Sequence, residues 1–371
     1  MKVCHITTAH PIDDIRIYHK ECLSLYNNNF NIHILGVVSP KIKNPKIPFS
    51  LVSSKRKNLI YRFFFLPYKM LKYAKKINAD VYHFHDPDLL IVGLFLKKAG
   101  KIVIYDIHED NPKAILSRDW GFKFLRKFIS VVFKWYENGI SKKLNYLIAA
   151  TQSIHNRFCK INKNTFIINN YPKLTVSESN TDISKRKRQI CFVGLISPQR
   201  GLEYVVKAME FVNARLLLIG NFTSEDFLKK LKSLNGWTNV DYLGYQSRES
   251  LEIYLSESYA GVVTFLPLPN HTHSQPNKMF EYMAAGLPII ASNFPLWEEI
   301  VDKNKCGICV NPENSEDIAG AISFLFENPS VAKQMGMNGK KAVVDKYNWD
   351  NEAEKLIRIY NSINLNEYAI K

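Results

Sequence analysis

Cysteine is scarce in this sequence of 371 residues. The six cysteines are scattered along the chain, which argues against a disulfide framework and favours a reducing compartment. Cys306 and Cys309 have a metal-like spacing, but no second pair is present to complete a zinc site. We therefore interpret this pair as ordinary thiols of the core, where free cysteine packs as a small hydrophobe.

Signals for export and for membrane insertion are absent as well. The first ten residues, MKVCHITTAH, lack the apolar run of a signal peptide. No stretch of about 18 uncharged apolar residues occurs, so we predict no membrane-spanning segment. We expect a cytoplasmic protein whose contact with a membrane, if any, is peripheral.

Several binding motifs are also missing. The first predicted strand is followed by TTAHPIDDIRIYHKE, which lacks the GxGxxG of a dinucleotide-binding turn. No recognised nucleic-acid-binding module occurs, and the aromatic residues do not follow the pattern of a sheet that binds single strands. The sequence thus predicts neither a dinucleotide cofactor nor a nucleic-acid partner.

Positive charge is abundant and uneven. The formal net charge is +16. Residues 1–185 hold 30 Lys and Arg against 13 Asp and Glu, whereas residues 186–371 hold 20 against 21. The whole excess lies in the first half, which indicates an anionic partner of that half, such as a phosphorylated substrate or a membrane surface.

Short apolar runs alternate with longer helical patterns throughout the chain. Such alternation is typical of βαβ units, and its repetition predicts two α/β domains with parallel sheets. The expected strands cover residues 2–8, 31–37, 80–85, 102–108, 146–151, 190–196, 214–220, 240–245, 260–267, 287–292 and 306–310. The expected helices lie around 16–28, 59–78, 87–99, 121–143, 200–212, 224–235, 248–258, 276–285, 315–327 and 329–346.

The boundary between the two domains is visible in the sequence. Residues 171–189 are polar and charged without apolar periodicity, so we predict a linker there. We expect one domain over residues 1–170, a second over 190–349, and a final helical segment over 350–371. In facing sheets of this kind, ligands bind in the loops beyond the carboxyl ends of the strands.

The loop after the first predicted strand carries His10, Asp13, Asp14 and Arg16. Two interpretations of the aspartates stay open, because a carboxylate before a helix either caps it and favours its dipole or faces the ligand. His10 is harder to explain as a cap. We therefore expect His10 to face the cleft.

Two further loops of the first half end in titratable residues. His85, Asp86 and Asp88 follow the third predicted strand, and Asp86-Pro87-Asp88 resembles a metal-binding DxD. We favour capping around the proline and predict no metal. The next strand ends in YDIHED, where Asp106 and His108 stand together. A histidine beside acidic groups can orient a substrate or move a proton, although a structural histidine is the alternative.

The second half offers two loops that suit a diphosphate. Ser197 to Gly201 leads into a helix, with Arg200 beside the free amides of the helix start. Residues 273–278 lead into another helix that carries Glu281, three residues after Lys278. A carboxylate there can accept hydrogen bonds from both hydroxyls of a ribose. The competing interpretation is a surface pair of Lys278 and Glu281 worth about a few tenths of a kcal/mol.

Taken together, these segments resemble the retaining glycosyltransferases of glycosyltransferase family 4. PNKMFEYMAAGLPIIAS looks like the family's donor-binding signature, and FVGLISPQRGLEYVVKAM, RLLLIG, VDYLGY, GICVNP and YNWDNEAEKLIRIY follow in the expected order. TAHPIDDIRIYHKE and YDIHED resemble a bacterial branch linked to surface polysaccharide assembly. The resemblance implies a GT-B fold, with two facing Rossmann-like domains and a C-terminal helix that returns to the N-terminal domain.

The resemblance also assigns donor-binding roles. Glu281 matches the family's ribose-binding glutamate, and His273 stands where the family has a second glutamate that faces the donor sugar. Arg200 matches a diphosphate-binding lysine, and Lys278 restores positive charge where Leu195 replaces a family arginine. The loop whose amides approach sugar and diphosphate comprises Ser274, Gln275, Pro276 and Asn277. We expect nucleotide-sugar binding to persist, with the sugar choice altered by His273.

The activity implied by the resemblance is a metal-independent transfer that retains the anomeric configuration. The donor is a nucleotide-diphosphate sugar of the UDP or GDP type, so no separate cofactor is expected. His108 matches a histidine beside the reacting sugar, and we name it as the catalytic residue. The acceptor side comprises His10, Asp14, Arg16, His85 and Asp86.

The basic first half then fits a membrane-linked acceptor. LIYRFFFLPYKMLKYAKKINA and DWGFKFLRKFISVVFKWYENGISKK interleave cations with aromatic and aliphatic residues. Helices of this kind bind anionic membranes, although packing on the sheet with exposed lysines is the alternative. We expect a saccharide or polyprenyl-diphosphate-linked acceptor at the inner face of the cytoplasmic membrane.

Two other functions stay open. A sugar-nucleotide epimerase has the same architecture, and fold alone does not exclude it. Release of nucleoside diphosphate only with an acceptor would separate the two. The other is a non-catalytic membrane- or polysaccharide-binding protein with a relic site, which the change at His273 keeps open.

Overall fold

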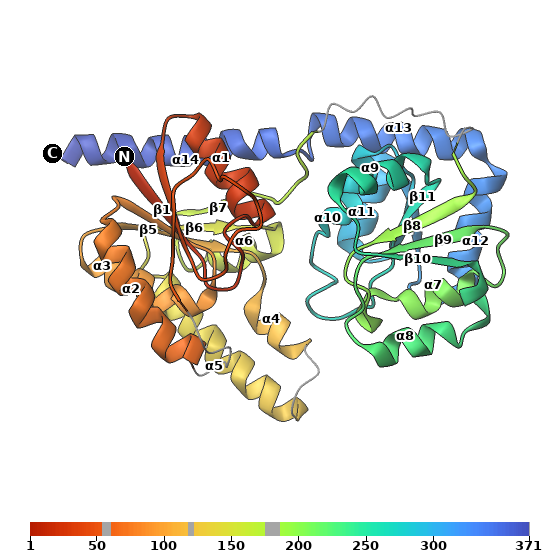
Figure 1. The fold of residues 1–371 in the computed structure, drawn as a ribbon, viewed down its shortest axis with the longest axis horizontal. Helices are drawn as coiled ribbons and strands as arrows, with labels where there is room; N and C mark the ends of the chain where they lie inside the picture. Colours follow the sequence, from red (N-terminus) through yellow and green to blue (C-terminus); the bar gives the residue numbers. More distant parts are fainter. Residues whose placement is uncertain (54–60, 118–121, 175–185, 371) are drawn as a thin grey trace. The chain divides into compact units, whose positions relative to one another are not determined.

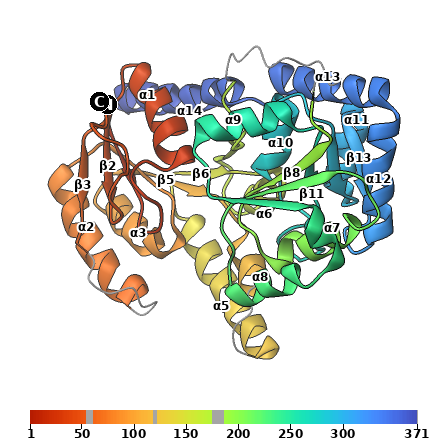
Figure 2. The ribbon, with the colours of Figure 1, turned by 45° about the vertical axis from the view of Figure 1, so that its right-hand side comes forward.

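A computed structural model describes residues 1–53, 61–117, 122–174 and 186–370 of the chain. The chain divides into two compact units: unit 1 comprises Met1–Asn170 and Trp349–Lys371, and unit 2 comprises Tyr171–Asn348. Each unit contains one parallel sheet with helices around it (Figures 1 and 2). The predicted α/β fold with two parallel sheets is confirmed.

The sheet of unit 1 has seven strands in the order β3-β2-β1-β4-β5-β6-β7. All neighbouring strands pair in parallel. The strands are β1 (Lys2–Ile6), β2 (Asn31–Gly36), β3 (Phe49–Leu51), β4 (Val81–Phe84), β5 (Ile102–Ile107), β6 (Tyr146–Ala149) and β7 (Thr165–Ile167). The five longer ones were predicted, whereas β3 and β7 are three-residue edge strands without a periodic pattern to mark them.

The helical segments of unit 1 cover both faces of this sheet. They are η1 (Ile15–Cys22), α1 (Leu23–Asn27), η2 (Tyr61–Phe65), α2 (Leu66–Ile77), η3 (Pro87–Leu89), α3 (Leu90–Lys98), α4 (Asn111–Leu116), α5 (Lys123–Ser141), α6 (Gln152–Phe158) and α14 (Trp349–Ile370). The short helices α4 and α6 were not predicted.

Helix α14 completes one face of the unit 1 sheet. Its residues Trp349, Leu356 and Tyr360 are fully buried, in one cluster with residues of β1, β2, η1 and α1. The indole nitrogen of Trp349 donates to Ser24 Oγ at 2.9 Å. The expected return of the C-terminal helix to the N-terminal domain is confirmed (Figure 1).

The sheet of unit 2 has six parallel strands in the order β10-β9-β8-β11-β12-β13. The strands are β8 (Gln189–Val193), β9 (Arg215–Ile219), β10 (Val240–Gly244), β11 (Ala260–Val263), β12 (Ile289–Ser292) and β13 (Gly307–Val310). Every one was predicted, because strands buried on both faces read as continuous apolar runs. Cys306, just before β13, lies in the core as expected, and Cys309 is half-buried.

With two additions, at Asn235–Asn239 and Pro295–Asn304, the helical segments of unit 2 follow the predicted pattern. They are η5 (Pro198–Arg200), α7 (Leu202–Ala208), α8 (Glu225–Lys232), η6 (Asn235–Asn239), α9 (Arg248–Glu257), α10 (Asn277–Ala284), α11 (Pro295–Asn304), α12 (Ser315–Glu327) and α13 (Pro329–Asp345). The unpredicted helix α11 buries Trp297 completely against Phe265. The segment expected to be a linker starts with Tyr171, which packs on Phe280 of this unit, and its residues 175–185 lie outside the described part.

Strand order reverses once in each sheet. In unit 1 this switch point lies between β1 and β4, and in unit 2 it lies between β8 and β11. Loops at the carboxyl ends of two such strands diverge and leave a crevice where α/β folds bind ligands. The loops singled out in the sequence follow these four strands and β5. Within the described residues, no helix has both the length and the apolar character needed to span a membrane.

Candidate functional site

Asp86, at the end of β4, holds the loop that follows β1. Its Oδ2 accepts hydrogen bonds from Thr7 Oγ1 and the Thr8 amide, both at 2.7 Å, and from the Ala9 amide at 3.2 Å. It makes no capping bond to the short helix that follows, so the expectation that Asp86 acts as a cap is wrong. Burial raises the pKa of Asp86, but the charge of His10 and these hydrogen bonds outweigh burial and lower it.

Asp88 is held in the same network. Its carboxylate accepts a hydrogen bond from Thr8 Oγ1 at 2.7 Å. It also forms a bidentate ion pair with Arg62, whose Nη2 and Nε donate at 2.9 and 3.1 Å. Arg62 thus belongs to the switch point of unit 1, although nothing in the sequence pattern marked it. Because Asp86 and Asp88 both bind protein donors, they form the anchor of a loop and do not have the character of an open DxD metal site.

His10 lies between two carboxylates. Its Nδ1 is 3.7 Å from Asp14 Oδ2, and its Nε2 is 3.6 Å from Asp86 Oδ1. Asp14 also caps η1 by accepting from the amides of Arg16 and Ile17. Donation from His10 to the Asp14 carboxylate is the main cause of a raised pKa for His10. The side chain of His10 is 36% exposed, so its ring is accessible from solvent.

Asp13 behaves differently from its neighbour. Its carboxylate accepts from the amides of Lys41 and Ile42, in the segment between β2 and β3. The capping interpretation is therefore confirmed for Asp14 and wrong for Asp13.

Arg16 and Asp106 form a buried ion pair beneath this surface. Arg16 Nε and Nη2 each lie 2.8 Å from a different oxygen of Asp106, and Nη1 donates to the Ile168 carbonyl at 3.0 Å. Arg16 and His85 are each only 3% exposed. Both were expected to line the cleft. The structure places them in the interior of unit 1, because their polar atoms bind the buried Asp106.

His108 is positioned by that same aspartate. Its Nε2 lies 2.8 Å from Asp106 Oδ2, and His85 Nδ1 lies 3.2 Å from the same oxygen. The His108 side chain is 19% exposed, unlike the fully buried Asp106. A carboxylate on one ring nitrogen fixes the tautomer and the orientation of the ring. The Asp106 contact occupies Nε2, so Nδ1 is the nitrogen that a ligand would meet.

In unit 2, the backbone of the segment after β8 packs closely on the backbone at the end of β11. Gly201 has φ +70°, and a Cβ at this position would lie 1.9 Å from the Thr264 carbonyl oxygen. The Leu266 amide donates to the Gln199 carbonyl at 3.0 Å. The Arg200 guanidinium lies over the Phe265 ring, 3.8 Å from its centroid. These contacts hold Arg200 beside the loop that leads to α10.

The loop before α10 is anchored at its centre. Ser274 accepts at its carbonyl from the Trp297 indole nitrogen at 2.7 Å, and its amide donates to the His271 carbonyl. His273 is exposed. Gln275 Oε1 is buried and has no hydrogen-bond partner within the described residues.

Helix α10 begins without a side-chain cap at Pro276, so amides of its first turn remain for a ligand. Its position is fixed from below, because Tyr282 Oη accepts from the Val193 amide at 2.8 Å and its ring packs under Gly261 of β11. Lys278 Nζ lies 2.5 Å from Glu281 Oε2, and both side chains are about one-third exposed, at 31% and 32%. The surface pair considered above is therefore present. A ribose bound to Glu281 would replace the ammonium group of Lys278 with its own hydroxyl groups.

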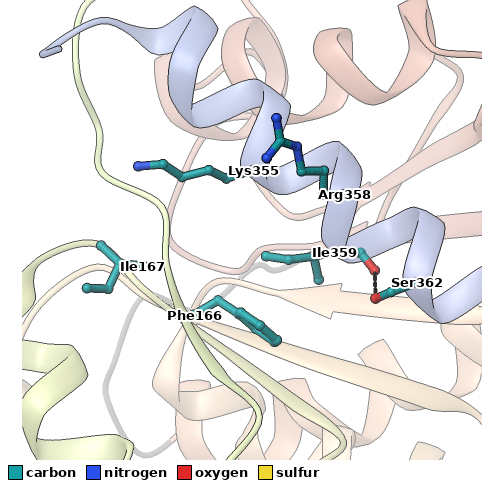
Figure 3. Close-up of a pocket in the computed structure, with 6 residues that line it drawn as sticks. All are labelled: Phe166, Ile167, Lys355, Arg358, Ile359 and Ser362. Carbon is teal, nitrogen blue, oxygen red and sulfur yellow. Dashed lines mark hydrogen bonds between the residues drawn. The ribbon is translucent and has the colours of Figure 1, made fainter.

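A pocket elsewhere on unit 1 is a poor alternative site (Figure 3). It lies between β7 and α14, and its lining residues are Phe166, Ile167, Lys355, Arg358, Ile359 and Ser362. Lys355 pairs with Glu352 at 2.7 Å and Arg358 with Glu354 at 3.3 Å, so its cations are engaged within α14. None of the residues selected from the sequence lines it.

Comparison with solved structures first defines the class of fold. Sucrose-phosphate synthase from Thermosynechococcus elongatus superposes with a TM-score of 0.77 over 98% of this chain and 99% of that one, at 17% identity. The Anabaena protein HepE, in complex with UDP-glucose, gives a TM-score of 0.75 over 98% and 100%, at 16% identity. The fold is that of the GT-B glycosyltransferases.

Comparison of sequences then shows which proteins the chain is similar to. Residues 176–342 match the family model described as glycosyl transferases group 1. An uncharacterized glycosyltransferase of Methanocaldococcus jannaschii is 27% identical over 76% of this chain and 75% of its own length. An uncharacterized 41.2 kDa protein in the cps region of Klebsiella pneumoniae is 23% identical over 91% and 93%. The residues that match the family model all lie within unit 2.

Several polar residues of unit 1 were missed by the sequence reasoning. His5 in β1, His83 in β4, Glu21 in η1 and Tyr360 in α14 lie under the switch point and are fully buried. The available signal was a polar residue inside an otherwise apolar strand, as in VYHFH, where it was taken as part of the strand. A buried polar group of this kind requires a partner.

Proposed function

We propose that this protein is a retaining glycosyltransferase that moves a hexosyl group from a nucleotide-diphosphate sugar to a saccharide or lipid-linked saccharide. One observation carries the proposal: Arg200, the start of α10 and Glu281 all follow β8 or β11, the two strands at the switch point of unit 2. The group 1 family match covers these residues. The solved structure of HepE with UDP-glucose, which has the same fold, supports a donor of the UDP type.

In the proposed donor complex, Glu281 accepts hydrogen bonds from the ribose hydroxyls, and the diphosphate lies at the uncapped start of α10. Arg200 is held over Phe265 and adds a positive charge to the same segment. Backbone amides, the helix dipole and a guanidinium together meet the charge of a diphosphate. The reaction proposed here therefore uses no metal ion.

The proposed transfer takes place on one face of the donor sugar. The bond from the anomeric carbon to the diphosphate oxygen breaks, and the acceptor oxygen forms its bond on the same side. The leaving phosphate oxygen takes the acceptor proton. His108, oriented by Asp106, contacts the sugar and stabilises the charge that develops in the transition state.

Replacing Glu281 by alanine tests the donor site. We expect an affinity for the nucleotide sugar about 10- to 100-fold lower, since hydrogen bonds to a charged group contribute about 1.5–3 kcal/mol. The measurement is a thermal shift with a panel of UDP and GDP sugars, because a ligand that binds only the folded state raises the midpoint temperature of unfolding.

Glu354→Ala is the matched control, because it breaks an exposed pair on α14 and leaves the donor site intact. If Glu281 forms only a surface pair, Glu281→Ala and Glu354→Ala will both leave nucleotide affinity unchanged. If the wild-type protein binds no sugar nucleotide at all, the transferase proposal fails.

A peripheral membrane contact is proposed for unit 1. Helix α5 exposes Phe124, Phe128, Val131 and Trp135 at helical spacing, with exposed fractions from 55% to 77%. Exposed lysines at positions 123, 127 and 134 accompany this stripe. Apolar side chains flanked by cations are the pattern of a helix that lies in the surface of an anionic bilayer. Such a surface suits a polyprenyl-diphosphate-linked acceptor in surface polysaccharide assembly.

The double variant Phe128→Ser and Trp135→Ser tests this contact. We expect binding to vesicles with anionic lipid to fall about tenfold or more, since each side chain contributes roughly 1.5–3 kcal/mol on burial. Sedimentation with vesicles measures it, and the midpoint of unfolding stays the same because both side chains are exposed. Phe211→Ser, an exposed aromatic of unit 2, is the control. Equal binding by all three proteins would contradict the proposal.

A further inference from the structure

Three histidines and a glutamate meet in the interior of unit 1, beneath the switch point. They are His5 in β1, His83 in β4, His85 directly after β4, and Glu21 in η1. None is more than 3% exposed. The histidine rings lie together, with centroids 4.5 Å apart for His5 and His83, 4.7 Å for His83 and His85, and 5.2 Å for His5 and His85.

Several polar atoms in this cluster have no hydrogen-bond partner within the described residues. They are Nε2 of His5, Nε2 of His83 and both carboxylate oxygens of Glu21. Arg16 Nε lies 3.0 Å from Glu21 Oε1, but both oxygens of Asp106 already accept from this guanidinium. A buried polar group without a partner costs about 1–3 kcal/mol, so His83 Nε2 and the Glu21 carboxylate, whose Oε2 lies 3.9 Å from it, indicate a ligand between them.

The distances suit a metal ion. One ligand atom from each of the four residues lies within 4.8 Å of the others. His5 Nδ1 is 3.0 Å from His85 Nε2, and Glu21 Oε2 is 4.0 Å from His5 Nδ1 and 3.9 Å from His83 Nε2. Ligand bonds of about 2.0–2.1 Å in a tetrahedron place ligand atoms roughly 3.3 Å apart. Small side-chain movements therefore close the cluster around one ion.

The outer nitrogens of two histidines are already held. His83 Nδ1 lies 2.8 Å from Tyr360 Oη of α14, and His85 Nδ1 lies 3.2 Å from Asp106 Oδ2. Both rings therefore direct Nε2 into the cluster. Metal-binding histidines generally contact a hydrogen-bonding group through the second nitrogen, which fixes the ring and its tautomer.

We propose that His5, His83, His85 and Glu21 bind one zinc ion in the interior of unit 1. Imidazole nitrogens with one carboxylate are a donor set of zinc, and four protein ligands leave no position for a substrate. The site is thus structural, and it joins β1, β4 and η1 directly and α14 through Tyr360. It departs from our expectation that the chain binds no metal, and it is separate from the metal-free transfer reaction.

The neighbouring group of His85, Asp106 and His108 is a weaker candidate for the ion. Its three ligand atoms also lie close together. Both carboxylate oxygens of Asp106, however, already accept hydrogen bonds from Arg16. We therefore assign Asp106 to the outer shell, where it orients His85.

The metal content of the full-length, untagged protein tests the proposal. Purified without chelator and dialysed against zinc, it should hold about one zinc per chain, and chelation should lower the midpoint of unfolding until zinc, but not magnesium, is returned. Glu21→Gln and His83→Ala should lose the bound zinc. His33→Ala is the matched control, since His33 bonds Ser50 in the same unit and lies outside the cluster.

The wild-type protein also provides a test that does not depend on the folding of any variant. X-ray absorption at the zinc edge should show nitrogen and oxygen ligands at about 2.0–2.1 Å without sulfur at about 2.3 Å. A sulfur shell would place the ion at Cys306 and Cys309 and overturn the assignment. The assignment would also be overturned if the wild-type protein held less than about one-tenth of a zinc ion per chain after dialysis and chelation did not change its midpoint of unfolding.

Discussion

Replacing Arg16 by methionine is expected to destabilise unit 1 by about 3–5 kcal/mol, because breaking a buried ion pair leaves the partner charge without compensation. Asp106 then remains buried beside His85 and His108. Burial raises the pKa of Asp106, and Arg16 is the main charge that lowers it well below its usual range. Methionine keeps the length and apolar character of the arginine stem and removes the charge.

Urea unfolding followed by a probe in unit 1 measures this effect, since the two units need not unfold in one transition. Arg358→Met is the matched control, because it breaks an exposed pair with Glu354 in the same unit and should cost less than about 1 kcal/mol. The double variant Arg16→Met with Asp106→Leu removes both charges and should regain part of the stability. A loss below about 1 kcal/mol for Arg16→Met alone would show that the pair contributes little.

His108→Ala is expected to lower kcat by about 10²- to 10⁴-fold, the range for a positioned group that acts in the transition state. Nucleotide affinity should change little, because the residues proposed to bind the nucleotide lie in unit 2. Release of nucleoside diphosphate in the presence of acceptor measures kcat, and titration with the nucleotide sugar measures affinity.

Asp106→Asn should reproduce part of the loss, since an amide no longer fixes the same tautomer of His108. His155→Ala is the control, because His155 is a half-buried histidine of unit 1 on α6, outside the switch point. Activity of His108→Ala above about half the wild-type value would remove His108 from the reaction. Equal losses in kcat and in nucleotide affinity would indicate damage to the fold.

Much of the fold could be predicted, because its strands are buried on both faces. β8 to β13 are short apolar runs between helical patterns, and such runs have few other structures available to them. The misses are short elements. β3 and β7 have three residues each, and α11 begins with Pro295, which is compatible with a first helical position but gives no periodic signal.

The candidate site was predicted less completely. Strand ends could be found from the sequence, so the loops with His10, Asp86 and His108 could be selected for their titratable groups. The direction of each side chain could not be found. Arg16 and His85 turn inward because Asp106 attracts them, and Asp86 binds one hydroxyl and two amides 77 to 79 residues away.

By itself, the sequence determined the alternation of strands and helices, the two-domain organisation and the glycosyltransferase motif of the second half, since each depends on residues close together in the chain. Only the tertiary structure brought His5, Glu21, His83 and His85 into one cluster and placed Asp106 between Arg16 and His108. These residues come from β1, β4, β5 and η1, and their contacts depend on the β1-β4-β5 strand order. A hydrogen bond between residues as distant as His83 and Tyr360, 277 positions apart, leaves no local pattern in the sequence.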